Sequence, residues 1–153
     1  MKDQARVVVI GGGIVGCSIL YHLAKLGWKD VVLVEKSELT AGATCMAAGL
    51  LTQFNSSPTM MRLRKTSSEM YDQLGVYETV GSLRIASSQN QHMTLQRDVS
   101  TAKGVGLDVH TISPKEAMEI MPWMSPNDLF SAVYLPGDGH LDPHATTYAV
   151  AKA

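Results

Sequence analysis

The chain has 153 residues, 45% hydrophobic and 18% charged, which is the composition of an ordinary globular protein. Its formal net charge of −1 gives no electrostatic reason to expect nucleic acid or an anionic membrane as a partner. No apolar run is long enough to span a membrane, and a strand pattern begins by Arg6, so we expect no signal or transit peptide. We therefore expect a cytoplasmic protein with two reduced cysteines, Cys17 and Cys45.

The first predicted element is an apolar strand, Arg6–Ile10, that runs directly into a glycine-rich turn. The turn has the pattern G-x-G-x-x-G, with glycines at Gly11, Gly13 and Gly16. Gly11 allows the tight turn, Gly13 lets the backbone approach a pyrophosphate, and Gly16 lets the following helix pack against the strand. That helix begins at Ile14 and Val15, so its free N–H groups and positive dipole end face the phosphates. The pattern predicts a dinucleotide-binding βα turn.

A second apolar strand follows at Val31–Val34, after a helix that Gly27 is placed to cap. It ends on Glu35 and Lys36, about 20 residues beyond the glycines, where an acidic side chain reaches the ribose hydroxyls of an adenosine. The same carboxylate would repel a 2′-phosphate, which disfavours an NADP-type ligand. The alternative is that Glu35 is a surface residue at the end of a strand.

The segment from Ser37 to Leu50 is rich in small residues and contains no strand-like run. Small side chains let the backbone lie against a large flat ligand, and Thr40 and Thr44 supply hydroxyls for a pyrophosphate or ribityl chain. This segment favours FAD over NAD. Its other candidate cofactor contacts are Ala43, Met46, Ala47, Gly49 and Leu50. The alternative is a glycine-alanine loop that enters a short helix.

These segments resemble the FAD-dependent amine oxidoreductases of the dimethylglycine and sarcosine dehydrogenase group, which have the D-amino-acid-oxidase-like fold. The resemblance covers nearly the whole chain, including Gly81–Ile85 and Pro136–Pro143. It implies an α/β fold with a Rossmann-like FAD-binding βαβ unit, an incomplete parallel sheet and the start of a mixed α+β substrate domain. It assigns residues 1–57 to the FAD domain, 58–135 to the substrate region and 136–153 to the return into the FAD domain.

One position departs from the family. Members commonly carry a histidine just before the Ala-Ala-Gly, and that histidine bonds covalently to the flavin, whereas this chain has Met46 there. A thioether has no proton to lose and cannot form that bond. Cys45 could bond a flavin, but it lies one position out of register. We therefore expect FAD to be bound noncovalently.

The resemblance implies removal of a hydride equivalent from the carbon next to a secondary or tertiary amine nitrogen, followed by hydrolysis of the iminium to a demethylated amine and an aldehyde. The substrate is then a small amine, the electron acceptor stays open, and no residue here is assigned as catalytic acid or base. One alternative is a non-catalytic paralogue of the type found as a regulatory subunit of pyruvate dehydrogenase phosphatase. Another is an NAD-dependent dehydrogenase, which the loop Thr40–Leu50 disfavours.

The rest of the chain predicts short alternating elements. We expect helices at 58–74, 90–103 and 114–121, strands at 81–86, 107–112 and 130–135, and a last helix that Asp142 caps with Pro143 in its first turn. Gly104 is expected to end the second of these helices. A capping box at Ser113–Glu116 opens the third.

Two clusters of polar side chains are given no chemical role. Arg62, Arg64 and Lys65 are interpreted as a solvated helix face. The alternation Asp138, His140, Asp142, His144 could ligate a metal, but Asp142 is better explained as a cap, so no metal is expected.

The sequence supplies only two strands of a parallel nucleotide-binding sheet. We therefore expect the chain to be the N-terminal piece of a longer enzyme, and expect residues 1–153 alone to be poorly folded and inactive.

Overall fold

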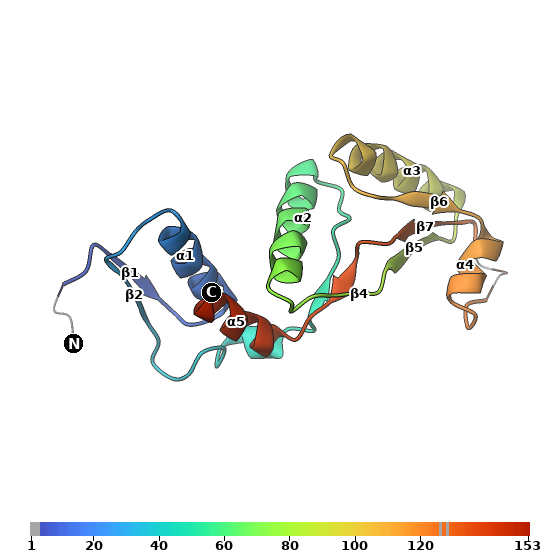
Figure 1. Cartoon of the computed structure of the whole chain (residues 1–153). Helices are drawn as coiled ribbons and strands as arrows, with labels where there is room; N and C mark the ends of the chain where they lie inside the picture. Colours follow the sequence, from blue (N-terminus) through green and yellow to red (C-terminus); the bar gives the residue numbers. More distant parts are fainter. Residues whose placement is uncertain (1–3, 126, 128) are drawn as a thin grey trace. The chain divides into compact units, whose positions relative to one another are not determined.

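The computed structural model describes residues 4–125, 127 and 129–153 (Figure 1). The chain divides into two compact units. The first unit comprises Met1–Gly49, Tyr71–Tyr77 and Leu141–Ala153, and the second comprises Leu50–Met70 and Glu78–His140. From the sequence we expected an FAD domain at 1–57, a substrate region at 58–135 and a return into the FAD domain at 136–153. This assignment of segments to cofactor and substrate stays a prediction.

The first unit contains the predicted βαβ arrangement. Strands β1 (Val7–Ile10) and β2 (Val31–Val34) pair in parallel, with Val7 opposite Val31 and Ile10 opposite Val34. Helix α1 (Ile14–Lys25) connects them, and helix α5 (Pro143–Lys152) packs against α1 (Figure 1). Val9 is buried between the sheet and α1, because its side chain lies on the face that the helix covers. The α/β fold expected from the sequence is thus confirmed.

The end of α1 and the start of α5 follow their sequence signals. At the end of α1, Gly27 has a φ of +87°, the Gly27 N–H donates to Ala24 and the Trp28 N–H donates to Leu23, which is a Schellman motif. At the start of α5, the Asp142 carboxylate accepts the Ala145 N–H at 2.6 Å. Pro143 occupies the first turn of α5, where a backbone N–H would have no partner within the helix, so its missing N–H costs no hydrogen bond.

The second unit is built on an antiparallel sheet in the order β5 (Ser82–Ala86), β7 (Ser131–Leu135), β6 (His110–Ile112). Helix α3 (Gln89–Gly104) and helix α4 (Pro114–Ile120) pack on β7, and most of helix α2 (Pro58–Gln73) also belongs to this unit. The core is a cluster of apolar side chains from these elements and the loops between them: Phe54, Met61, Ala86, Leu95, Val99, Ala102, Leu107, Val109, Val133 and Leu135.

A second small sheet holds three strands of two residues each. They are β3 (Leu50–Leu51), β8 (Gly139–His140) and β4 (Glu78–Thr79), with β8 in the middle and both neighbours antiparallel to it. The sequence did not predict these strands. Within the preceding segment, the structure has a short 3-10 helix, η1 (Ala43–Met46), where we expected small residues without strand character.

The end of α3 corrects one expectation. The helix continues through Gly104, and the left-handed residue that ends it is Gly106, with a φ of +76°. The Leu107 N–H donates to the Ala102 carbonyl as part of this cap, so Leu107 belongs to the end of the helix. Strand β6 begins at His110 and is shorter than the predicted 107–112.

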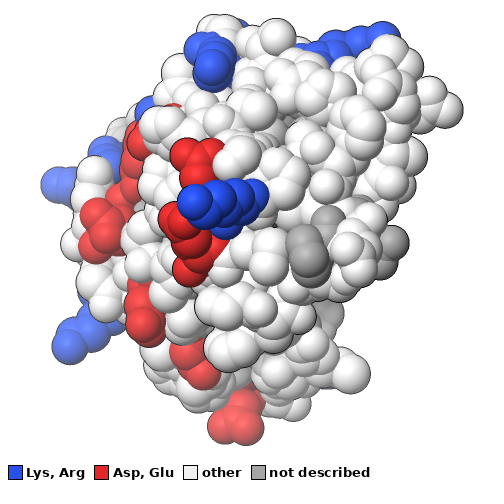
Figure 2. All heavy atoms as spheres, turned by 90° about the vertical axis from the view of Figure 1, so that its right-hand side faces the viewer, with Lys and Arg blue, Asp and Glu red and all other residues white. Residues whose placement is uncertain are grey.

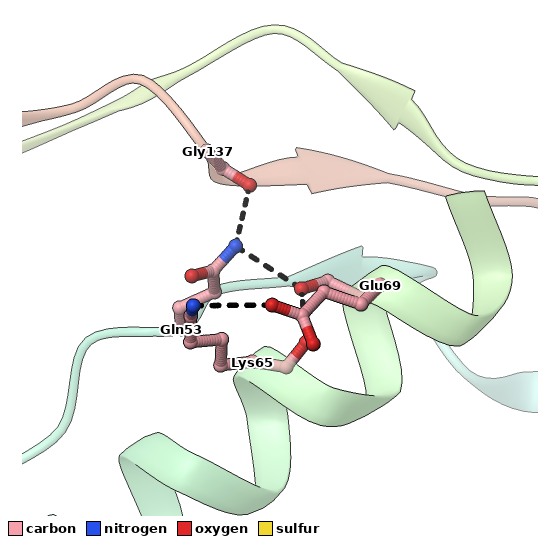
Figure 3. A network of polar contacts seen from close by, with 5 residues as sticks. Gln53, Lys65, Glu69 and Gly137 are labelled. Carbon is pink, nitrogen blue, oxygen red and sulfur yellow. Dashed lines mark hydrogen bonds and ion pairs between the residues drawn. The ribbon is translucent and has the colours of Figure 1, made fainter. Parts of the chain in front are cut away.

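The glycine turn between β7 and β8 is anchored by buried polar contacts. The Asp138 carboxylate is 1% exposed and accepts the Gln53 N–H at 2.7 Å and the Ser82 hydroxyl at 2.6 Å. The side-chain Nε2 of Gln53 donates to the Gly137 carbonyl at 2.8 Å and to the Ser68 hydroxyl on α2 at 3.1 Å (Figure 3). These contacts give the Pro-Gly-Asp-Gly segment a structural role, because they fix the turn against the loop before α2.

The charged surface has no dominant sign on the face drawn in Figure 2, where acidic side chains surround a basic one and much of the remaining surface is uncharged. Among the helices in the described part of the chain, none combines the length and apolar content needed to cross a bilayer.

Candidate functional site

The glycine turn between β1 and α1 has a backbone that only glycine fits at two positions. Gly11 has a φ of +107°, and its N–H donates to the Val34 carbonyl at 2.8 Å, which ties the turn to the end of β2. A Cβ on Gly16 would lie 1.9 Å from the Gly11 carbonyl oxygen. The turn and the first turn of α1 are therefore packed backbone against backbone, as the sequence pattern requires.

The N-terminus of α1 carries the positive end of the helix dipole, which favours an anion. Its N-cap residue, Gly13, supplies no capping side chain, and the first turn contains no acidic residue. The Thr44 hydroxyl accepts the Ile14 N–H at 3.1 Å, and a Cβ on Gly13 would lie 2.9 Å from that hydroxyl oxygen. Thr44 therefore packs directly against the Gly13 backbone, at a position that leaves no room for a side chain on residue 13.

Glu35 is hydrogen-bonded to the glycine turn between β1 and α1, and its contact with a ribose stays a prediction. One carboxylate oxygen accepts the Gly12 N–H at 2.7 Å, and the other accepts the Ser37 N–H at 3.0 Å. These two backbone donors, Gly12 first, hold the pKa of Glu35 below its ordinary value of 4.5. The side chain is ionised at neutral pH, and an ionised carboxylate accepts hydrogen bonds from ribose hydroxyls.

Thr40 is buried and holds the loop after β2 against the glycine turn. Its φ is +72°, its N–H donates to the Gly12 carbonyl at 3.0 Å, and its hydroxyl lies 2.6 Å from Nδ1 of His144 on α5. The hydroxyl that the sequence assigned to a cofactor is therefore engaged by His144, and a cofactor contact at Thr40 stays a prediction.

The structure does not tie the other predicted residues to the turn in the same way. Lys36 and Ala47 are exposed, as are Ala43 and Met46 on η1, where 84% of Met46 is accessible. Gly49 has a φ of +73°, and a Cβ there would lie 2.1 Å from the Leu141 carbonyl oxygen, which requires glycine for packing. Leu50 is the first residue of β3 and belongs to the second unit.

Two contacts of the site, those of Gly12 and the one between His144 and Thr40, were not predicted from the sequence. Gly12 contacts both Glu35 and Thr40 through its backbone, and the run of three glycines was a signal that could have pointed to it. A Cβ on Gly12 would lie 2.6 Å from Leu39. His144 contacts Thr40 across 104 residues of sequence, and nothing local in the sequence indicates such a pairing.

The residues with alternating acidic and imidazole side chains each have a separate partner. Asp138 anchors the turn between β7 and β8, Asp142 caps α5, and His144 contacts Thr40. His140 lies 3.7 Å from Glu78. Within the described residues, no group of three or more metal-ligating side chains converges.

The basic cluster on α2 is not a uniformly solvated face. Arg62 is exposed, and Lys65 forms an ion pair at 3.1 Å with Glu69 one turn further along the helix (Figure 3). Arg64 is partly buried and donates to the Thr52 and Phe54 carbonyls, both at 3.2 Å. The sequence interpretation was therefore wrong for Arg64.

Comparison with known proteins gives a consistent match. A family model described as FAD dependent oxidoreductase matches residues 6–153. Human mitochondrial dimethylglycine dehydrogenase is 38% identical over 98% of this chain, and human mitochondrial sarcosine dehydrogenase is 40% identical over 100% of it. The mouse mitochondrial regulatory subunit of pyruvate dehydrogenase phosphatase is 37% identical over 100% of the chain. The match spans 18% of the length of each of these relatives.

The fold has a solved counterpart. The crystal structure of L-proline dehydrogenase from P. horikoshii superposes with a TM-score of 0.91 and 29% sequence identity, and the match covers 99% of this chain and 42% of that one.

Proposed function

The chain belongs to the family of FAD-dependent oxidoreductases, and from this premise we propose that the whole protein oxidises the carbon–nitrogen bond of a small secondary or tertiary amine of the dimethylglycine or sarcosine type. The names of the two dehydrogenases, 38% and 40% identical to this chain, support this substrate class. The observation that carries the proposal is the glycine turn with the Glu35 carboxylate hydrogen-bonded to it at 2.7 Å.

The site fits FAD by the groups that it presents. The positive N-terminus of α1 suits a pyrophosphate, and the ionised Glu35 suits a ribose. Bound FAD would supply the acceptor for a hydride equivalent from the amine carbon. The residues proposed to hold it are Gly11, Gly13, Ile14, Val15, Gly16, Glu35, Lys36, Thr40, Ala43, Thr44, Met46, Ala47, Gly49 and Leu50.

We further propose that the FAD is held noncovalently. Met46 stands where the resembling dehydrogenases commonly carry the histidine that bonds the flavin, and a methionine thioether forms no such bond. Acid precipitation should release all yellow colour into the supernatant. Colour that stays with the precipitated polypeptide would contradict the proposal, and loss of that colour in Cys45→Ser would identify Cys45 as the point of attachment.

The substrate proposal is tested on the whole protein by anaerobic bleaching of the flavin absorbance. Sarcosine and dimethylglycine should bleach it with release of formaldehyde, whereas the quaternary amine glycine betaine should not, because its nitrogen has no lone pair to assist hydride loss. Bleaching by NADH alone, without any response to the amines, would contradict the proposed reaction. The electron acceptor that reoxidises the flavin is not assigned.

A second candidate is a regulatory protein that has the fold without the turnover. The 37% identity to the pyruvate dehydrogenase phosphatase regulatory subunit favours it, together with the methionine at position 46. FAD binding without bleaching by any amine would support this second candidate over the first.

The compartment also stays a proposal. The sequence-based expectation is a cytoplasmic protein, whereas the names of the three relatives place those proteins in mitochondria. Fractionation of cells that express the whole protein would decide between them.

A further inference from the structure

The second unit contains a cavity of about 830 Å³ that the proposed FAD site does not use. Its lining comes from the loop before α2, from α2, from β5 and from α3. Arg64 and Arg84 contribute the positive charges of the lining and Asp98 the one negative charge, while Ile85, which is 52% exposed, contributes apolar surface. The cavity therefore combines two positive groups with an exposed apolar side chain.

The two guanidinium groups are held side by side by one hydroxyl. The Thr52 oxygen Oγ1 accepts from Nη1 of Arg64 at 3.4 Å and from Nη2 of Arg84 at 3.2 Å. Arg64 uses the same nitrogen for the carbonyls of Thr52 and Phe54. Each guanidinium has five N–H donors, so each keeps donors on its other nitrogens that these contacts do not occupy.

Neither arginine is neutralised within the part of the chain that the structure describes. No carboxylate there forms an ion pair with Arg64 or Arg84, including Asp98 in the same lining. Two like charges that share one neutral acceptor repel each other, and an anion between them removes that repulsion and gains charge-assisted hydrogen bonds. The arrangement is therefore complementary to an anion with planar oxygen acceptors.

We propose that this cavity binds a small organic monocarboxylate, with the carboxylate on Arg64 and Arg84 and the hydrocarbon part against Ile85. Two arginines and Asp98 leave one net positive charge in the lining, which matches a single carboxylate. A phosphate dianion or a nucleotide carries more negative charge than the lining balances, which disfavours both. All these residues belong to the second unit, so the proposal does not depend on the amine-oxidation function.

The test is calorimetric titration of the protein with butyrate, with its neutral analogue butyramide and with inorganic phosphate. Butyrate should bind, and butyramide and phosphate should bind at least about tenfold more weakly, because the first lacks the charge and the second carries too much of it. Equal binding of butyrate and butyramide would overturn the proposal. Binding of phosphate as tight as that of butyrate would overturn the assignment to a monocarboxylate.

Variants locate the site. Arg84→Gln should weaken butyrate binding by about tenfold, whereas Arg62→Gln, an exposed arginine on the same helix as Arg64, should leave it unchanged. Arg64→Gln removes the donor to two loop carbonyls and can loosen the fold, so Arg84→Gln, whose side chain is exposed, is the decisive variant. Butyrate binding that survives Arg84→Gln at full strength would place the ligand elsewhere.

A competition experiment tests whether the bound carboxylate belongs to the amine substrate or to a separate molecule. Dimethylglycine that competes with butyrate, with competition lost in Arg84→Gln, would make the cavity a binding site for the amine substrate itself. Butyrate binding without competition by dimethylglycine would make it a site for a separate carboxylate. The FAD content of each variant, measured by its absorbance, separates failure of this site from failure of the cofactor site.

Discussion

Gly16 is the residue at which the glycine turn tolerates the least change. In Gly16→Ala the new Cβ would lie 1.9 Å from the backbone oxygen of Gly11, and a backbone atom cannot rotate away as a side chain can. We expect a loss of about 1–3 kcal/mol or more in the free energy of unfolding, measured by urea denaturation, together with loss of FAD binding.

The matched control is Gly104→Ala at the end of α3. Nothing lies within 4 Å of a Cβ there, and the residue is helical, so alanine should leave stability unchanged or raise it by up to about 1 kcal/mol. Equal behaviour of the two variants would show that the turn is not as tightly packed as the structure has it.

The Glu35 carboxylate should give stability a distinct pH dependence. Its pKa in the folded protein is below the ordinary value of 4.5, because Gly12 and then Ser37 donate to it. Its contribution is therefore fully present above that ordinary value and is lost as the pH falls through the lower, folded-state pKa. Urea denaturation between about pH 6 and about pH 3 should show Glu35→Gln and the wild type converging toward acid pH.

Glu38→Gln is the control for that experiment, since it removes the same charge from an exposed position in the same loop. A stability difference for Glu35→Gln that stays constant down to the lowest pH would mean that its hydrogen bonds do not depend on ionisation.

Among single residues, the sequence predicted which ones lie together where local spacing decides it. Gly11, Gly13, Gly16 and Glu35 meet at one turn because a βαβ unit brings the ends of neighbouring parallel strands together. It missed the pairing of Thr40 with His144, because that contact depends on how α5 packs against α1. No local rule links positions that far apart.

The element α4 offers a test of a predicted helix start. Ser113 and Glu116 form a full capping box, in which the Ser113 hydroxyl accepts the Glu116 N–H and the Glu116 carboxylate accepts the Ser113 N–H at 2.7 Å. Ser113→Ala should cost about 0.5–2 kcal/mol in the free energy of unfolding, measured by thermal or urea denaturation.

Ser100→Ala serves as its control, because Ser100 lies in the middle of α3 and its hydroxyl bonds only back to the Gln96 carbonyl. Alanine should be neutral or slightly stabilising there. A comparable loss in both variants would argue against the capping box as the source of stability at Ser113.

Elements with a strong local pattern were predicted well, and elements defined by remote partners were not. Helix α1 ends at the glycine cap that the sequence indicated, and helix α5 begins at the predicted Asp142 cap. The strands β3, β4 and β8 have two residues each, too few for any periodic pattern, and they exist only because they pair with one another. The end of α3 was also misplaced. Both Gly104 and Gly106 could have ended the helix, and the hydrogen bonds of the cap form around Gly106.

For the whole molecule, the first unit leaves apolar side chains of its parallel sheet uncovered. Val8 is 52% exposed, Ile10 85% and Val34 44%, and Ile10 lies opposite Val34 in the sheet. Parallel sheets are normally covered on both faces. We therefore expect the polypeptide of residues 1–153 to bind a hydrophobic dye such as anilinonaphthalene sulfonate, with increased dye fluorescence as the readout.

Replacing Ile10 by Thr should reduce that fluorescence, while Ile120→Thr, an exposed isoleucine on α4, should change it little. Absence of dye binding by the wild-type polypeptide would show that another part of the molecule covers this face of the sheet.

We propose that the glycine turn between β1 and α1, together with Glu35, forms the adenosine and pyrophosphate site of an FAD protein. The most direct measurement is equilibrium titration of the protein, freed of bound cofactor, with FAD and with NAD, followed by flavin fluorescence and by calorimetry. FAD should bind, NAD should not displace it, and Glu35→Ala should weaken FAD binding by about tenfold while Glu38→Ala leaves it unchanged. Preferential binding of NAD, or FAD binding that is indifferent to Glu35→Ala, would contradict the account.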